Sequence, residues 1–419
     1  MNRNFNDKRH IRTLPGNVWA LSLTSFFMDV SSEMIHNILP LFLANVLGVR
    51  TVFIGLIEGI AETISSLLRV FSGWFSDRLH HRKWLAVAGY GISAISRPFL
   101  YVANSWGVVA GVRWTDRVGK GVRTAPRDAL VADSVSASQR GLAFGFHRAA
   151  DTAGASLGIG IALITILLTH GDISRLTGSI FRIIVLISLI PAFLSVLTLV
   201  IGARDVTVSS REAYSMSGFS SMGRSFMLLM VIVGIFELGN SSDAFLILLA
   251  QERGVSVNGI LWMLLMYNIV YAAVSTPAGS LSDRIERRKM IISGWFIYSF
   301  IYLGFAFSKT SGHIFILYAM YGIYYGMSYG TAKALISDIV PALYRGTAYG
   351  IYNSVLGFLD LPASLVAGIL WQGIGPWTGL GPSAPFLFGA LLASLAAILM
   401  CFWKPDEISN SIISPTGKT

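Results

Sequence analysis

Twelve long apolar segments divide this sequence, and each has about the length that an α-helix needs to cross a bilayer, roughly 20 residues. Backbone polar groups inside lipid must bond within their own segment or in a closed barrel, and segments this rich in Gly and Leu do not alternate as barrel strands do. Only 13% of the residues are charged, against about 25% in soluble domains. We therefore predict an all-α membrane protein with twelve transmembrane helices, near residues 17–46, 52–76, 84–104, 107–133, 140–168, 179–203, 224–250, 258–281, 289–307, 312–338, 345–373 and 384–403.

Several short sequences occur twice, about half the chain length apart. The sequence from Gly73 to Lys83 is echoed from Gly279 to Lys289, each with Gly-x-x-x-Asp-Arg followed by basic residues, and the sequence from Arg140 to Gly145 is echoed from Arg345 to Gly350. Such doubling is typical of transporters built from two equivalent halves. We predict two six-helix bundles with a cavity between them, at residues 17–203 and 224–404, joined by a linker at 204–223 and flanked by segments 1–16 and 405–419.

Basic residues gather in the connections on one side of the predicted membrane. If the N-terminus lies inside, the cytoplasmic segments hold about 18 Lys and Arg residues and the outer loops about four. Because positively charged loops stay in the cytoplasm, we expect both termini there, in a multi-pass protein of the plasma membrane (the inner membrane of a bacterium). The net charge of +10 then reflects topology. A nucleic-acid partner is not expected, since it would need a basic soluble face.

The first repeated sequence resembles motif A of the major facilitator superfamily, with Gly73, Asp77, Arg78 and Arg82 in place and His80 instead of the usual second glycine. In such a loop the aspartate can accept hydrogen bonds from the positive N-terminal end of a neighbouring helix. The resemblance implies a contact that holds one conformation and opens in another, although the basic residues could also serve only to fix the topology. The residues expected in this conformational latch are Gly73, Asp77, Arg78, Arg82, Gly279, Asp283 and Arg284.

Two further sequences resemble motifs of this family. The segment from Arg117 to Ala125 is similar to motif B, with Lys120 and Arg123 where that motif has Gln and Gly. The spacing of the antiporter motif C is reproduced, without its proline and closing glycine pair, by Gly145, Gly154 and Gly158. These glycines let helices approach closely, and dense packing alone explains them as well as an antiport role does. Over nearly its whole length the chain thus resembles a drug/proton-antiporter-like secondary transporter with two pseudo-symmetric six-helix bundles.

Ionisable side chains inside the predicted spans are distributed unevenly between the halves. Each costs at least ~2.5 kcal/mol on insertion scales and is a functional candidate. Away from the ends of the spans, the first half holds at least 16 of them, whereas the second half holds Glu237, Asp243, Lys333 and Asp360. We therefore expect proton coupling in the first half, where two acids four residues apart share a helix face and should titrate as a coupled pair. The proton-coupling candidates are Asp29, Glu33, Asp116, Arg117 and Asp151.

A stripe of cations on the fourth span faces, in our interpretation, a wall of aromatic and amide side chains from the second half. Such a site fits an amphipathic organic solute. In the alternative reading, the buried cations and acids only neutralise one another, and the tyrosines only pack. The substrate-binding candidates are Asn37, Lys120, Arg123, Arg127, Arg148, Phe236, Asn240, Tyr267, Tyr321 and Tyr325.

The sequence offers little for catalysis. One Gly-x-Ser-x-Gly match, from Gly326 to Gly330, lies inside an apolar helix rather than at a strand-to-helix elbow, and no Walker-type or metal-ligand motif is present. We expect no enzyme, cofactor or resident metal, and a monomer in the lipid bilayer.

The functional hypothesis is proton-coupled export of a small organic solute by alternating access, in exchange for protons. The alternatives are proton symport or uptake of an anionic metabolite, divalent-metal export through Asp29, Glu33 and His36, and a membrane receptor that transports nothing.

Overall fold

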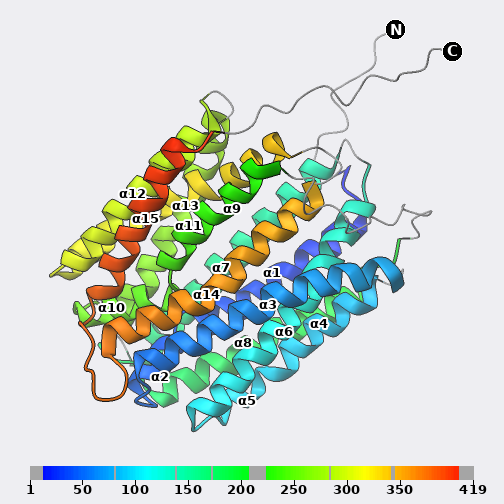
Figure 1. Cartoon of the computed structure of the whole chain (residues 1–419). Helices are drawn as coiled ribbons and strands as arrows, with labels where there is room; N and C mark the ends of the chain where they lie inside the picture. The colour runs from blue at the N-terminus through cyan, green and yellow to red at the C-terminus, as the bar shows by residue number, and fades with distance from the viewer. Residues whose placement is uncertain are drawn as a thin grey trace.

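The computed structural model describes residues 13–79, 82–136, 139–170, 173–206, 223–282, 285–340 and 345–404. These ranges form fifteen helices and contain no strand, and the helices run side by side (Figure 1). Their bounds are α1 Gly16–His36, α2 Leu39–Asn45, α3 Thr51–Leu79, α4 Arg82–Ser96, α5 Pro98–Tyr101, α6 Trp106–Asp133, α7 Arg140–His170, α8 Gly178–Gly202, α9 Gly223–Gly239, α10 Ala244–Glu252, α11 Val257–Ser282, α12 Arg287–Phe307, α13 Ser311–Ile339, α14 Arg345–Gln372 and α15 Ala384–Phe402.

Each predicted span corresponds to one helix or to two consecutive helices. Nine spans are single helices, and the other three are the pairs α1–α2, α4–α5 and α9–α10. Eight stretches among the described residues are long and apolar enough to cross a membrane on composition alone. The others carry more polar residues, and α6 has the most charges, with several of its cations buried against other helices. The structure thus gives the predicted all-α fold, with α1–α8 as the first half and α9–α15 as the second.

Three spans that the sequence predicted as single helices are interrupted. Pro40 is at the start of α2 and Pro98 at the start of α5; proline has no N–H to donate and its ring clashes with the preceding turn, so each helix ends before it. The third break runs from Asn240 to Asp243, between α9 and α10. The breaks after α1 and after α9 occur in the first span of each half, which is a further trace of the doubling.

Within the first half, α7 packs along α1 through glycines. A methyl group in place of the α-hydrogen of Gly154 would overlap the carbonyl oxygen of Phe26, and at Gly158 it would overlap that of Val30. These contacts bring the two backbones together as small residues do in membrane helices. Close packing was also expected at Gly145, but this glycine is exposed and has no neighbouring atom within 4 Å of an added Cβ. The adjacent Phe146 does contact Trp19 of α1, so Gly145 lies on a face of α7 that is turned away from α1.

The two halves meet most extensively along α3 and α14. An added Cβ at Gly59 would lie 2.7 Å from the Cα atom of Leu361, and the Thr63 hydroxyl donates to the carbonyl oxygen of Gly357 at 2.8 Å. We call the end where α1 begins and α15 ends the terminal end, and the opposite end the far end. Because α3 begins and α14 ends at the far end, this contact joins the halves from there towards the middle.

Hydrogen bonds across the two halves close the far end. The Arg50 guanidinium donates to the carbonyl oxygens of Gln372 and Gly373 at 2.9 and 3.1 Å, and the backbone N–H of Thr51 donates to the Gln372 side-chain oxygen at 2.8 Å. On the other side of the interface, the N–H of Val257 donates to the carbonyl oxygen of Ile173 at 2.9 Å. These bonds therefore link the loops of one half to those of the other.

Substitution of Gly158 by alanine tests the α1–α7 packing. Gly158→Ala should lower the midpoint of thermal unfolding in detergent, because overpacking typically costs about 1–3 kcal/mol. Gly160→Ala is the matched control on the same helix: an added Cβ there meets no atom within 4 Å, and alanine favours a helix over glycine by about 1 kcal/mol. Equal midpoints for the two variants would show that α1 and α7 are not packed this closely.

Candidate functional site

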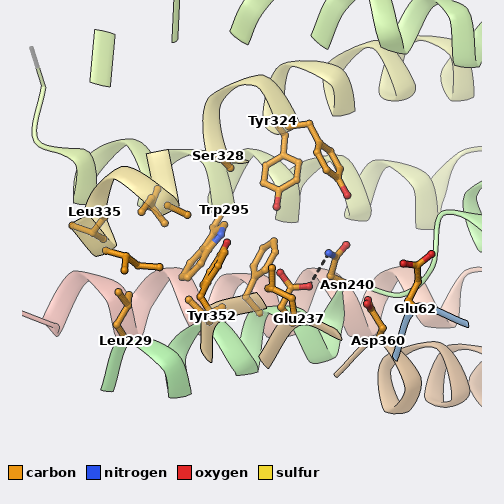
Figure 2. A pocket seen from close by; sticks show the side chains of 17 residues that line it. Glu62, Leu229, Glu237, Asn240, Trp295, Tyr324, Ser328, Leu335, Tyr352 and Asp360 are labelled. Carbon is orange, nitrogen blue, oxygen red and sulfur yellow. Dashed lines mark hydrogen bonds between the residues drawn. The ribbon is translucent and has the colours of Figure 1, made fainter. Parts of the chain in front are cut away.

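A cavity of about 320 Å³ lies at the boundary between the halves, within the second half except for one residue of α3 (Figure 2). We call it the aromatic cavity. Its wall is supplied by α9, α12, α13 and α14, whose rings stand around the space: Phe236, Trp295, Tyr324, Tyr325 and Tyr352. Three carboxylates also line it, from Glu62 on α3, Glu237 on α9 and Asp360 on α14. Aromatic and acidic groups therefore share one enclosed space.

The three carboxylates differ in their partners. Glu62 accepts from Arg117 at 2.9 Å and lies 3.8 Å from Arg113. Glu237 accepts a hydrogen bond from the Asn240 side chain at 3.0 Å. Among the described side chains, no Lys, Arg or His lies within ion-pair distance of Glu237 or Asp360. The second half thus presents two acids without a cation to the cavity.

Ring stacking and hydrogen bonds fix the aromatic wall. Phe236 stacks on Trp295 with ring centroids 4.8 Å apart and an angle of 12° between the planes. The Tyr298 hydroxyl donates to the side-chain oxygen of Asn240 at 3.1 Å. Tyr321 is buried and donates to Asp243 at 3.0 Å. Of the candidate substrate-binding residues, Phe236, Asn240 and Tyr325 line this cavity, whereas Tyr321 lies behind its wall.

A second cavity of about 290 Å³, which we call the acidic cavity, lies between α1 and α7 on one side and α11 and α13 on the other. Asp29, Glu33 and Asp151 line it, together with Arg148, Tyr267 and Tyr325. Tyr325 belongs to both walls and so separates the two cavities. Three of the five proton-coupling candidates and two further substrate-binding candidates therefore meet here, although the sequence did not place them beside α11.

Hydrogen bonds orient the side chains of the acidic cavity. Asn37, a substrate-binding candidate, donates to the Glu33 carboxylate at 2.9 Å. Arg148 donates to the hydroxyl of Tyr271 across the halves at 3.2 Å, and His147 lies 3.7 Å from Asp151. Asp29 has no ion pair or hydrogen bond among the described residues, so its carboxyl group faces the cavity without a fixed partner.

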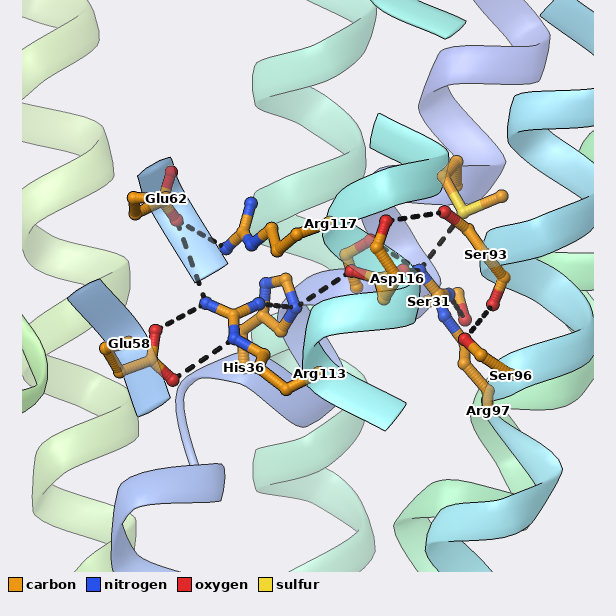
Figure 3. Close-up of polar contacts among 12 residues, drawn as sticks. Ser31, His36, Glu58, Glu62, Ser93, Ser96, Arg97, Arg113, Asp116 and Arg117 are labelled. Atoms are coloured by element: carbon orange, nitrogen blue, oxygen red, sulfur yellow. Dashed lines mark hydrogen bonds and ion pairs between the residues drawn. The ribbon is translucent and has the colours of Figure 1, made fainter. Parts of the chain in front are cut away.

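An ion network fills the interior of the first half (Figure 3). Arg113 of α6 makes a bidentate pair with Glu58 of α3, at 3.1 and 2.6 Å. It also contacts His36, whose ring lies 3.5 Å from Asp116. Asp116 is in turn 3.5 Å from Arg97, at the break between α4 and α5. Charged and polar side chains from α1, α3, α6 and the break after α4 are thus joined in a chain of direct contacts.

Further cations of α6 are not among the residues that line either cavity. Arg123 donates to Ser93 at 2.6 Å and covers the ring of Tyr90, and Arg127 pairs with Asp128 at 2.7 Å. Of the candidate cations on α6, the side chain of Lys120 has no hydrogen bond or ion pair among the described residues. Arg117 keeps two buried nitrogens without a hydrogen-bond partner, although its third donates to Glu62.

The duplicated motif produces the same ion pair in each half. Arg82, at the start of α4, pairs with Asp133 at the end of α6. Arg287, at the start of α12, pairs with Asp338 near the end of α13 at 3.1 Å. Gly73 lies on α3, where an added Cβ would lie 3.4 Å from the Cβ atom of Ala125 on α6. The other latch candidates cannot be placed: Asp283 and Arg284 lie outside the described residues, as do the side chains of Asp77 and Arg78 and the surroundings of Gly279.

Glu237 and Asp360 are two cavity residues that the sequence reasoning named as ionisable but did not choose as site candidates. Both lie inside predicted spans, but the concentration of charge in the first half directed attention there. A signal was present, because neither acid has a basic residue within one helical turn, at three or four positions on either side. An acid that has no basic residue nearby on its own helix is a better candidate for a functional role than an acid that can pair within that helix.

Comparison with known proteins agrees with this architecture. The family model for the Major Facilitator Superfamily matches residues 21–241 and 216–417. The chain is 36% identical over 397 residues to an uncharacterized MFS-type transporter of Methanocaldococcus jannaschii, covering 93% of this chain and 96% of that protein. A shorter match, 25% identical, covers 39% of this chain and 38% of a Na⁺, Li⁺, K⁺/H⁺ antiporter of Planococcus maritimus.

Among solved structures, the nucleoside transporter NupG superposes with a TM-score of 0.72 at 13% identity, covering 92% of this chain and 98% of that one. At this identity the likeness concerns the fold alone. The family is established by the model match over both halves and by the archaeal relative over nearly the whole length. The chain belongs to the Major Facilitator Superfamily and is a multi-pass secondary transporter, not an enzyme.

Proposed function

We propose that this transporter couples the export of a small organic solute to the entry of protons, by alternating access. The observation that carries the proposal is the set of carboxylates without basic partners at the boundary of the halves. Asp29 faces the acidic cavity, and Glu237 and Asp360 face the aromatic cavity. Groups that can change charge at the moving interface are what a coupled transporter needs.

The physical argument starts from the cost of an unpaired charge. A carboxylate held in a low-dielectric interior without a cation is unstable, so it binds a proton or another positive group instead. A proton taken up at Asp29 or Glu33 would change the charge between α1 and α11, on opposite halves. Any ligand that binds one arrangement of the halves more tightly shifts the equilibrium towards that arrangement. Protonation can therefore drive the exchange of states.

Three observations support the direction. The far end is closed by hydrogen bonds between the halves, and the distribution of basic residues predicts that the terminal end faces the cytoplasm. The partial motif C lies on α7, where Gly154 and Gly158 pack on α1 beside Asp29. The relative from Planococcus maritimus is an antiporter. We infer a carrier that binds its solute from the cytoplasm, releases it outside, and lets protons enter from outside.

Uptake of an anion remains the second candidate. Arg148, which lines the acidic cavity, and Lys120, which lacks a partner among the described residues, favour it. Against it, Arg113, Arg123 and Arg127 make contacts inside the first half. Divalent-metal export has less support, since His36 contacts Arg113 and Asp116 and the described residues contain no group of three metal-binding side chains.

Neutralising the acids of the acidic cavity tests the coupling. In proteoliposomes with an acidic interior and a trapped pH dye, a panel of ammonium, carboxylate and nucleoside solutes is added outside, and solute-evoked proton release is recorded. The double variant Asp29→Asn, Glu33→Gln should lose at least about 90% of this signal, because the two acids of α1 that would carry the proton can then no longer change charge. Glu286→Gln, on the exposed loop before α12, is the control and should retain it.

The coupling proposal fails if no solute evokes proton movement in the wild type, or if the double variant behaves as the wild type does. Solute exchange without a pH gradient, measured on the same vesicles, shows whether the variant is folded.

Removal of the Gln372 side chain tests the far-end closure. Gln372→Ala loses two hydrogen bonds to Thr51, and at about 0.5–1.5 kcal/mol each the open state should gain several-fold in population. The readout is the rate at which an impermeant maleimide labels Ser364→Cys, a buried position on α14 beside Gly55, in a Cys401→Ser background. Lys309→Ala, on the exposed loop before α13 at the same end, is the control. Unchanged labelling in Gln372→Ala would contradict this lock.

A further inference from the structure

Resting on the proposed function, we infer that the solute is an organic cation: an amine or quaternary ammonium compound with an apolar body. It binds in the aromatic cavity, where Glu237 and Asp360 neutralise its positive charge and the surrounding rings enclose its body. The aromatic cavity is thereby assigned a substrate class. The second half would then recognise the charge of the solute, whereas the sequence interpretation placed the charged substrate-binding residues mainly in the first half.

The charge of the wall is the first support. Three acids and no Lys, Arg or His stand among the described side chains that line the cavity. Glu62 is already balanced by Arg117 and Arg113, which leaves Glu237 and Asp360. A bound cation would supply the positive charge that these two groups lack, whereas a bound anion would meet two like charges without compensation.

The aromatic side chains are the second support. A cation over the face of a Trp, Tyr or Phe ring is attracted by the ring quadrupole, and more strongly where water is excluded. Trp295 and Tyr352 stand next to Glu237 in the cavity, and Tyr324 stands across from them (Figure 2). A bare metal ion would gain little from such a wall, since hard metal ions select oxygen ligands. An organic cation uses both the acids and the rings.

The arrangement along the cavity is the third support. Figure 2 shows Asp360 and Glu62 towards one end, Glu237 and Trp295 in the middle, and Leu335 at the other end. The polar and apolar parts of the wall are thus separated in space. A solute with a charged head and an apolar tail matches this order, and the volume of about 320 Å³ lies in the range of small-molecule sites.

The test compares three probes of nearly the same shape on the purified wild-type protein in detergent. Phenyltrimethylammonium is positive, tert-butylbenzene is its neutral isostere and benzenesulfonate carries a negative head on the same ring. Isothermal titration calorimetry should show that the cation binds at least about tenfold more tightly than either of the others. Equal affinity for the neutral isostere, or preference for the sulfonate, overturns the inference.

Variants locate the binding. Glu237→Gln and Asp360→Asn should each weaken phenyltrimethylammonium binding by about tenfold or more, and Glu286→Gln should leave it unchanged. Because the two acids come from different helices, α9 and α14, a folding defect in one variant leaves the other as the test. Binding that survives both substitutions places the cation elsewhere and overturns the assignment.

The proton-release assay separates this inference from the proposed function. If only carboxylate or nucleoside solutes evoke proton release, the substrate class is wrong and proton coupling stands. If phenyltrimethylammonium binds with the expected dependence on Glu237 and no solute moves protons, the coupling is wrong and the cation site stands.

Discussion

The pairing of buried charge is the constraint on which the first half depends. The helix α6 lies among membrane-spanning helices and still carries Arg113, Asp116 and Arg117, all buried. Removing one partner of a buried ion pair typically costs about 3–5 kcal/mol, so α6 is stable only beside helices that supply the opposite charges. Glu58 and Glu62 place α3 against it. The same contacts set the position of α3, which is also the helix that meets the second half.

The second half has the same arrangement of spans as the first, but its interior contains different side chains. The ion pair between the start of its third span and the end of its fourth is kept, as Arg287 with Asp338. Among its described residues, the interior holds stacked rings where the first half has an ion network. With few buried cations available, Glu237 and Asp360 are left without partners at the boundary of the halves. The asymmetry of the sequence thus becomes an asymmetry of roles: the first half pairs most of its buried charges, with Asp29 and Lys120 as exceptions, and the second half leaves charge for a ligand.

The boundary itself combines close packing with few polar bonds. Glycines on both α3 and α14 let the backbones touch, at Gly59 and near Gly357, so the halves fit together over a long line of contact. The hydrogen bonds that cross between them at the far end are individually modest, about 0.5–1.5 kcal/mol each. Rigid halves joined by weak, reversible contacts can exchange partners at the interface without unfolding. Tyr325 lines both cavities. Such a motion would therefore change the walls of the proton site and of the solute site together.

The sequence by itself determined the number of spans, the doubling and the all-α class, because hydrophobic length and repeated motifs are local properties of the chain. It also gave the close packing at Gly154 and Gly158 and the acids Asp29 and Glu33 on one helix face. Only the tertiary structure decided where the span breaks between α9 and α10, since no proline marks that position. Only the tertiary structure showed which charged side chains pair with one another, because partners such as Glu58 and Arg113 are 55 positions apart in the sequence. Whether a buried acid is paired depends on its neighbours in space, and for Glu237 and Asp360 those neighbours come from other helices.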